Sequence, residues 1–400
     1  MTGMDRRKFL EKLGRAGFAA FGLNAWAHVA RAATPPPKAG TTPPKTAASA
    51  KPSEPAAELI ERNAWPEHFE TTLAALGRSW TTRNDRFFVR SHLPVPIVDP
   101  ATWRLEVSGL VANPVTLSLA DLKAMPSTEA AVTLECAGNG RGLFKLPNTS
   151  GTQWERGAVG NAMWGGLKLM FLLRRAQPLP EARHVWFEAA DVGTLPDVPR
   201  FTRSIPIEKA MFDVLLAHTM NGESLPKLHG GPVRAIVPGW YGMASTKWVT
   251  RIRLEKTPSD SHFMARGYRY SYPGDDPAAL TPGVEEMMVK SVITRPFEGG
   301  KEALGKVRIQ GFAWAGPMGV RLVETSIDKG KTWKPAGFMG DTAPGAWRAW
   351  ATEYEVKTAT RMTVMARATD GKGDVQPIEA RPNLAGYANN SIHVVSFRVA

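Results

Sequence analysis

The last third of the chain alternates between apolar and polar residues, and this pattern constrains the fold more than any other feature. The clearest runs are residues 307–312, 323–327, 361–368 and 392–399. A period of two places every second side chain on one face of a strand. Residues 328–331, Asp-Lys-Gly-Lys, have the composition of a turn between two strands. Residues 284–400 are therefore predicted to form an all-β sandwich of immunoglobulin type.

The region before the sandwich has a mixed pattern. Short apolar runs typical of strands occur at residues 104–107, 132–135, 185–187 and 233–237. Residues 117–125 and 166–176 are predicted to be helices. Gly and Pro interrupt the region throughout. Residues 81–256 are thus predicted to form an α+β domain, which a proline-containing connector, residues 257–283, joins to the sandwich.

The N-terminus has the order of a targeting segment. Residues 5–12 resemble the twin-arginine export motif, and an apolar stretch and a small-residue site, Ala30-Arg31-Ala32, follow. We predict a signal peptide over residues 1–32 and a periplasmic protein exported by the twin-arginine route, with an amphipathic helix as the alternative. The apolar stretch is too short and broken for a membrane span, and we expect none in the mature chain. Residues 33–80 are predicted to be a Pro/Ala-rich linker and then a helix from about residue 56 to 78.

The chain carries a formal net charge of +13, which falls to +9 without the net +4 of residues 1–32. Such a balance suits an anionic substrate, an anionic cofactor or an acidic partner. Scattered basic residues also fit a solvated surface. No basic run is interleaved with aromatic residues, so nucleic acid is not expected as a partner.

Cys136 is the only cysteine. This excludes a disulfide within the chain, a c-type haem attached through two cysteines, and a four-cysteine iron–sulfur cluster. Cys136 lies where a predicted strand enters a Gly/Asn-rich turn that ends at Arg141. A thiolate is a soft ligand for a transition metal, and a guanidinium can bind an oxyanion. The alternative is that Cys136 is a buried core residue.

Five stretches in order resemble the sulfite oxidase family of molybdenum enzymes, and they cover about residues 80–400. The turn from Cys136 to Arg141, Cys-Ala-Gly-Asn-x-Arg, resembles the molybdenum-binding turn of that family. The others are residues 87–96, 154–166, 228–239 with 245–248, and 326–333 with 375–377. The resemblance implies a sulfite-oxidase-type molybdopterin domain followed by an immunoglobulin-like domain that forms a homodimer.

The resemblance also implies roles for individual residues around a molybdenum–molybdopterin cofactor. Cys136 would be the protein ligand of the metal. The residues implied to hold the pterin and its phosphate are Phe88, Arg90, His92, Asp191, His229, Arg234, Ser245 and Lys247. The residues implied to form the substrate pocket are Arg90, Arg141, Trp154 and Tyr268. Without the resemblance, His229 would be read as a turn histidine and Arg234 as part of a surface ion pair.

Two positions depart from the animal enzymes. Gly140 stands where those enzymes have a second arginine, and Ala385 replaces an arginine near the C-terminus. A third pocket arginine is therefore lost, with Arg381 as a candidate substitute. The haem domain of the animal enzymes is also absent, so we expect no haem in this chain.

These departures leave more than one function open. We expect oxidation of sulfite to sulfate, with electrons passed to a separate c-type cytochrome, as in bacterial periplasmic sulfite dehydrogenases. The alternative is the sulfane dehydrogenase subunit of a thiosulfate-oxidising system, which has a dihaem partner. A methionine sulfoxide reductase fits less well, because those enzymes lack the C-terminal β domain. A non-catalytic binding protein on the same scaffold is the remaining class.

Overall fold

A computed structural model describes residues 58–144, 149–193, 198–276 and 279–400. The predicted signal peptide and most of the predicted linker lie outside these residues. In the part of the chain that is described, no helix is long and apolar enough to cross a membrane.

The first described segment is a small antiparallel sheet rather than the predicted helix. Strands β1 (Leu59–Asn63), β2 (His68–Thr71) and β3 (Val89–Arg90) pair in the order β1-β2-β3, and only α2 (Leu73–Leu76) is helical. The helix prediction over residues 56–78 was wrong. Pro66 lies in the middle of that range, and a proline removes a helical hydrogen bond and disfavours helix at the preceding residue.

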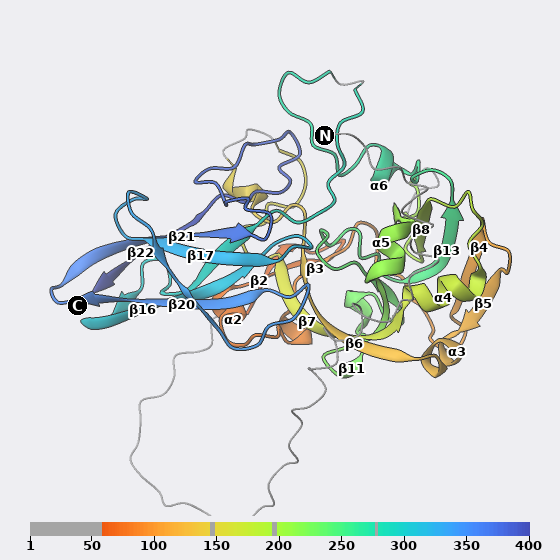
Figure 1. The fold of residues 1–400 in the computed structure, drawn as a ribbon, viewed down its shortest axis with the longest axis horizontal. Coiled ribbons are helices and arrows are strands. Elements are labelled where there is room, and N and C mark those ends of the chain that lie inside the picture. Colours follow the sequence, from red (N-terminus) through yellow and green to blue (C-terminus); the bar gives the residue numbers. More distant parts are fainter. Residues whose placement is uncertain (1–57, 145–148, 194–197, 277–278) are drawn as a thin grey trace, which may run out of the picture. The chain divides into compact units, whose positions relative to one another are not determined.

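The mixed region contains two five-stranded sheets. One has the order β11-β10-β7-β6, with β12 paired to β10, and the other has the order β5-β4-β13-β8-β9. In the second sheet β13 pairs in parallel with β4 and antiparallel with β8, as Figure 1 lets the reader follow. The strands are β4 (Arg104–Gly109), β5 (Val115–Ser118), β6 (Ser127–Glu135), β7 (Val159–Lys168), β8 (His184–Ala189), β9 (Thr202–Pro206), β10 (Leu215–Met220), β11 (Glu223–Ser224), β12 (Arg234–Ile236) and β13 (Val249–Glu255).

Short helices cover these sheets, and two of them fall inside predicted helical segments. α3 (Leu119–Ala124) begins after Ser118, whose hydroxyl and backbone form a capping box with Asp121. α4 (Leu169–Ala176) buries one face at Leu169, Leu172, Leu173 and Ala176, the spacing of an amphipathic helix. Both helices begin later than predicted because their first residues belong to β5 and β7. The remaining helical elements are α5 (Ile207–Phe212), α6 (His262–Ala265), η2 (Asn84–Arg86), η3 (Arg141–Leu143) and η4 (Lys227–His229).

The C-terminal region is a two-sheet β sandwich, as its alternation predicted. One sheet has the order β14-β16-β20-β19 and the other β15-β22-β21-β17-β18. Between them lies an apolar core that includes Ile309, Trp350 and Phe397. Lys329 and Gly330 adopt positive φ values of 63° and 82° in the predicted turn after β17. The strands are β14 (Lys290–Arg295), β15 (Lys301–Glu302), β16 (Gly305–Trp314), β17 (Val320–Ser326), β18 (Lys334–Pro335), β19 (Gly337–Met339), β20 (Arg348–Val356), β21 (Thr360–Asp370) and β22 (His393–Val399).

A shared apolar cluster joins the sandwich to the mixed region. Trp314 and Trp347 of the sandwich are buried in one cluster with Val159 and Tyr241 of the mixed region. The backbone N–H of Trp347 also donates to the Thr133 hydroxyl at 2.8 Å. The end of β6 is therefore in direct contact with the sandwich, which matters for the site described next.

Candidate active site

One cavity collects most of the predicted site residues. Part of its wall is apolar and includes Phe87, Phe201 and Leu228. The predicted residues that line it are Phe88, Arg90, His92, Cys136, Asp191, His229, Arg234, Ser245, Lys247 and Tyr268. Arg141 and Trp154 are not among the residues that line it. The cavity thus brings together side chains from segments that are far apart in the sequence.

Cys136 lies on the cavity wall directly after β6 and is 9% exposed. Its carbonyl accepts a hydrogen bond from the Asn139 N–H at 2.8 Å, which closes a tight turn. Gly140 ends the turn with φ of 90°, a left-handed conformation that favours glycine. A Cβ atom on Gly138 would lie 2.8 Å from Arg141 Nη1. Gly140 is therefore required by the backbone of the turn that presents the thiol, whereas a side chain at position 138 would displace the Arg141 guanidinium.

Two cations lie at another part of the cavity wall without an ion-paired carboxylate among the described residues. Arg234 is 5% exposed and donates to the carbonyls of His229 and Ser245, each at 2.8 Å. Lys247 Nζ donates to Ser91 Oγ at 3.1 Å and to the Leu228 carbonyl at 3.0 Å. Burial lowers the pKa of Arg234 to about 9. Burial, followed by repulsion from Arg234, lowers the pKa of Lys247 well below its usual value. A bound anion would offset both costs.

His229 and Asp191 add polar groups to the same cavity. His229 Nε2 lies 2.8 Å from the Asn84 carbonyl, and burial lowers the pKa of His229 to about 4. Asp191 is 2% exposed, and burial raises its pKa to about 6. Asp191 Oδ1 and Arg90 Nη1 are buried without a hydrogen-bond partner in the described part of the chain. Buried polar atoms are nearly always paired, so these two atoms indicate a ligand with both acceptors and donors.

Tyr268 and His92 form a polar pair on the cavity wall. The Tyr268 hydroxyl hydrogen-bonds His92 Nε2, and the His92 ring stacks on Phe201 with centroids 4.3 Å apart. Burial raises the pKa of Tyr268 above its usual value. Burial and then the positive charge of Arg90 lower the pKa of His92 well below its usual value. Both side chains are therefore neutral at pH 7, and the tautomer of the imidazole decides which of the two donates the hydrogen bond.

The structure gives Arg141 a different environment from the one that the resemblance implied. Its Nε donates to the Ala385 carbonyl at 2.8 Å and its Nη1 to the Thr152 carbonyl at 3.0 Å. Its guanidinium also lies 5.2 Å from the centre of the Tyr387 ring. Arg141 is thus committed to backbone carbonyls beside the cysteine turn, which is the arrangement of a supporting residue rather than of a group that faces the cavity.

Trp154 and Arg381 are also not among the residues that line the cavity. Trp154 is fully buried, with its ring centroid 5.8 Å from that of His68. Arg381 is exposed, and its guanidinium lies 4.0 Å from the centre of the Tyr272 ring. The structure therefore does not place Arg381 as a replacement for the arginine lost at Ala385.

Several residues of the site were not predicted from the sequence. Thr246 and Trp248 are adjacent in sequence to the predicted Ser245 and Lys247. Their position in the sequence could therefore have indicated that they line the cavity. Phe201 also lines the cavity but carries no local signal, because it reaches the cavity only through the fold. The same holds for Met243. Arg203, also missed, is 2% exposed and lies with its guanidinium 5.4 Å from the centre of the Tyr268 ring.

Comparison with known proteins agrees with this site. Residues 92–263 match the oxidoreductase molybdopterin binding domain, and residues 282–400 match the Mo-co oxidoreductase dimerisation domain. The two matches define an oxidoreductase of the molybdopterin-binding class. The chain is 35% identical over 347 residues to the sulfite oxidase of Gallus gallus, a match that covers 82% of this chain and 75% of that protein. The chain belongs to the sulfite oxidase family.

Two further relatives limit which properties of the family can be assigned to this chain. The chain is 36% identical over 353 residues to the mitochondrial sulfite oxidase of Mus musculus, with 84% of this chain matched and 64% of the mouse protein spanned. The crystal structure of the sulfane dehydrogenase SoxCD from Paracoccus pantotrophus superposes with a TM-score of 0.75 at 30% identity. That match covers 84% of this chain and 85% of that chain. Family membership therefore leaves both a sulfite and a sulfane substrate open.

The cavity residues fit a molybdenum–molybdopterin cofactor. Arg234 and Lys247 supply the positive charge that a phosphate requires, and burial lowers the pKa of both, a cost that a bound phosphate would offset. Asp191 offers the unpaired acceptor that a polar ring system needs. Cys136 supplies one soft ligand on the same cavity.

Proposed function

We propose that this protein oxidises sulfite to sulfate at a molybdenum centre whose one protein ligand is Cys136. The reaction consumes water and releases two electrons and two protons with each sulfate. We propose that the electrons leave to a separate c-type cytochrome. The observation that carries the proposal is the cavity in which a buried thiol, an arginine with an unpaired nitrogen and the Tyr268–His92 pair lie together.

The positions of the cavity residues suggest a separate role for each in binding the cofactor or the substrate. A bound molybdenum cofactor supplies the two-electron oxidation at sulfur. Arg234, Lys247 and His229 hold the phosphate of the pterin, because they are cations and donors on one part of the cavity wall. Arg90 binds the substrate anion through its free Nη1. Tyr268 keeps its hydroxyl proton, because burial raises its pKa, and its hydroxyl is held on the cavity wall by a hydrogen bond with His92 Nε2.

The test is reduction of cytochrome c by sulfite, with rates normalised to molybdenum content. We expect turnover in the parent protein, and loss of both metal and turnover in Cys136→Ser. The pterin should be retained in that variant, because its phosphate contacts do not involve the thiol. Normal turnover in Cys136→Ser would rule out the mechanism.

A sulfane dehydrogenase is the second candidate, and two observations favour it. The similarity to SoxCD extends over most of both chains, and the arginine expected at position 385 is an alanine that Arg381 does not replace. A pocket with fewer cations suits a carrier-bound sulfur better than a free dianion. Activity with a persulfidated carrier protein but none with sulfite would select this candidate.

We also propose a periplasmic homodimer exported by the twin-arginine route. Residues 282–400 match a dimerisation domain, and Arg6 and Arg7 lie in a segment that resembles the twin-arginine export motif. Light scattering should report about 80 kDa for two chains without residues 1–32, as expected for an obligate interface. A monomer would contradict the dimer. Export that survives Arg6→Lys with Arg7→Lys would contradict the route.

A further inference from the structure

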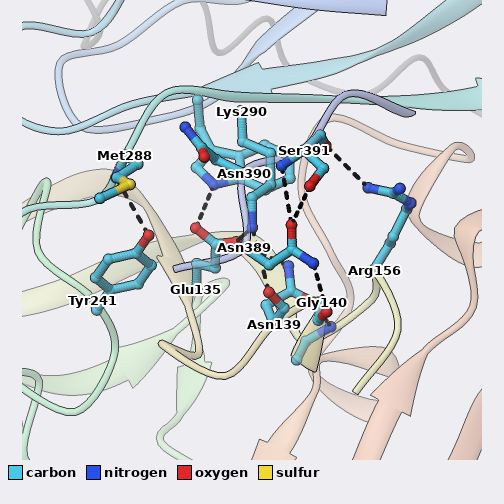
Figure 2. A network of polar contacts seen from close by, with 12 residues as sticks. Glu135, Asn139, Gly140, Arg156, Tyr241, Met288, Lys290, Asn389, Asn390 and Ser391 are labelled. Atoms are coloured by element: carbon cyan, nitrogen blue, oxygen red, sulfur yellow. Dashed lines mark hydrogen bonds and ion pairs between the residues drawn. The ribbon is translucent and has the colours of Figure 1, made fainter. Parts of the chain in front are cut away.

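The residue before the cysteine, Glu135, is fully buried and accepts hydrogen bonds from three different side chains. Its Oε1 accepts from Asn139 Nδ2 at 2.9 Å and from Lys290 Nζ at 2.5 Å, and its Oε2 accepts from Trp314 Nε1 at 2.8 Å. Figure 2 shows Lys290 and Asn139 converging on this carboxylate. An ionised carboxylate only accepts, so three donors define its orientation from three directions.

Two of these donors come from the sandwich. Lys290 is the first residue of β14 and Trp314 the last of β16, and the two face each other across the strand pair. They are 2% and 1% exposed. Directly opposed residues project to the same side of a sheet, so this strand pair presents both donors to Glu135 as one unit.

A second segment of the sandwich region holds the backbone of the cysteine turn. The Ala388 N–H donates to the Ala137 carbonyl at 2.8 Å, and Asn389 Nδ2 donates to the Gly140 carbonyl at 2.8 Å. The Asn389 amide is itself oriented, because its Oδ1 accepts from the N–H and the hydroxyl of Ser391 at 3.0 and 2.7 Å. Figure 2 shows Asn389 between Ser391 and Gly140.

We propose that Lys290 and Asn389 are positioning residues through which the sandwich sets the place of the Cys136 thiol. This rests on the proposed role of Cys136 as the metal ligand. Lys290 acts on the residue before the cysteine through Glu135, and Asn389 acts on the end of the turn through the Gly140 carbonyl. The sandwich is then a working part of the active site as well as a dimerisation domain.

Stability alone does not account for this arrangement. A buried ion pair is often no more stable than an apolar pair of similar size, because both charges lose their hydration. A lysine and a glutamate at this junction are therefore not needed to hold the two regions together. They do give the carboxylate a single orientation, and Asn139, one of its donors, also accepts from the Ala158 N–H at 3.1 Å, which ties the turn to the residue before β7.

The test separates positioning from folding with a charge-neutral double variant. Lys290→Met alone leaves Glu135 as an unpaired buried charge, so it can fail to fold. Glu135→Gln combined with Lys290→Met removes both charges, and we expect it to lower the thermal midpoint far less than Lys290→Met alone. The NH₂ group of the introduced glutamine would face the N–H donor of either Asn139 or Trp314. Two donors cannot hydrogen-bond each other, so the turn should still be displaced.

The measurements report on the position of Cys136 in its turn. In holoenzyme of the double variant, we expect kcat per molybdenum to fall about tenfold to a hundredfold with KM unchanged, together with an altered electron paramagnetic resonance spectrum of the metal. In the full-length chain prepared without cofactor, alkylation of Cys136 should change in rate by about tenfold for the same displacement. Asn389→Asp, which replaces the donor to Gly140 by an acceptor, should shift both signals in the same way.

Thr325→Val is the matched control. Thr325 is fully buried in the sandwich, and its hydroxyl lies 2.8 Å from that of Tyr354, away from the turn. It should lower the thermal midpoint without changing the spectrum or the alkylation rate. A double variant with parental kcat, spectrum and alkylation rate would overturn the proposal, and so would equal changes in Thr325→Val. The alkylation readout needs neither sulfite nor metal, so it remains decisive if the proposed substrate is wrong.

Discussion

Two lysines, one half-buried at the cavity and one fully buried at the junction with the sandwich, differ in what neutralises them. Lys247 donates to a hydroxyl and a carbonyl, and the strongest charge effect on its pKa comes from another cation, Arg234. Lys290 forms an ion pair with Glu135. Burial lowers the pKa of both lysines, and for Lys290 the paired carboxylate opposes that shift.

The difference separates a binding region from a supporting region. Taking a cation out of water is costly, and the cost is recovered only when an opposite charge is near. At Lys290 the protein supplies that charge itself. At Lys247 and Arg234 the described part of the protein leaves it to a ligand, which is why this end of the cavity suits a phosphate.

The strongest challenge to this comparison is to remove each lysine in turn. Lys290→Met should destabilise the protein by about 3–5 kcal/mol, because Glu135 is left buried and unpaired. Lys247→Met should change the stability of the cofactor-free chain by less than about 1 kcal/mol or raise it, while cofactor content falls. Urea unfolding and molybdenum analysis measure the two effects. Equal destabilisation by both substitutions would break the comparison.

The two arginines beside the cysteine extend the comparison to the substrate. Arg90→Lys should lower kcat/KM roughly ten- to a hundredfold, a loss of about 1.5–3 kcal/mol of transition-state stabilisation. The reason is that lysine lacks the planar guanidinium that faces the cavity. Arg141→Lys should lower cofactor content and leave the sulfite KM of loaded enzyme unchanged, because its partners are carbonyls. Kinetics normalised to molybdenum decides between them. A raised KM in Arg141→Lys would return that residue to the substrate pocket.

Two buried histidines near the unpaired cations predict the pH dependence of stability. Burial lowers the pKa of His68 and of His229 from 6.5 to about 4. Between these pH values the unfolded chain binds protons that the folded chain does not, so stability is full above pH 6.5 and falls as pH drops toward 4. Each histidine should contribute a slope of roughly 1.4 kcal/mol per pH unit.

Unfolding midpoints between about pH 7 and pH 5 measure this loss. His68→Gln removes one titrating group, and glutamine can still contact the Ser91 carbonyl that His68 Nε2 approaches at 2.8 Å. Its curve should therefore be flatter than that of the parent. An unchanged slope would show that His68 is protonated in the folded state.

The smallest effect is expected for an exposed cation with carboxylate partners. Arg251 is 46% exposed and pairs with Glu106 at 3.0 Å and Glu188 at 3.2 Å on the sheet with the order β5-β4-β13-β8-β9. Arg251→Gln should cost about 0.2–1 kcal/mol and less at high salt, because water screens the charges. A loss comparable to that of Lys290→Met would mean that burial is not what distinguishes the junction.

Short-range patterns were enough to predict several parts of this protein. The period-two alternation after residue 284 identified the sandwich, because strand periodicity is a property of neighbouring residues. The turn from Cys136 to Arg141 could be predicted in the same way, since Gly140 meets a local requirement of backbone conformation. Resemblance to a family then named cavity residues that are far apart in sequence.

Only the tertiary structure decided which charges have partners. Lys290 and Glu135 are 155 residues apart and Arg141 and Ala385 are 244 apart, so no local pattern indicates that they meet. The same holds for Lys247, which looks like an ordinary basic residue until the fold places it half-buried on the cavity wall, without an ion-paired carboxylate among the described residues. The type of a side chain is local information, but its desolvation and its partners depend on contacts between distant segments, and these determine whether a buried charge supports the fold or binds a ligand.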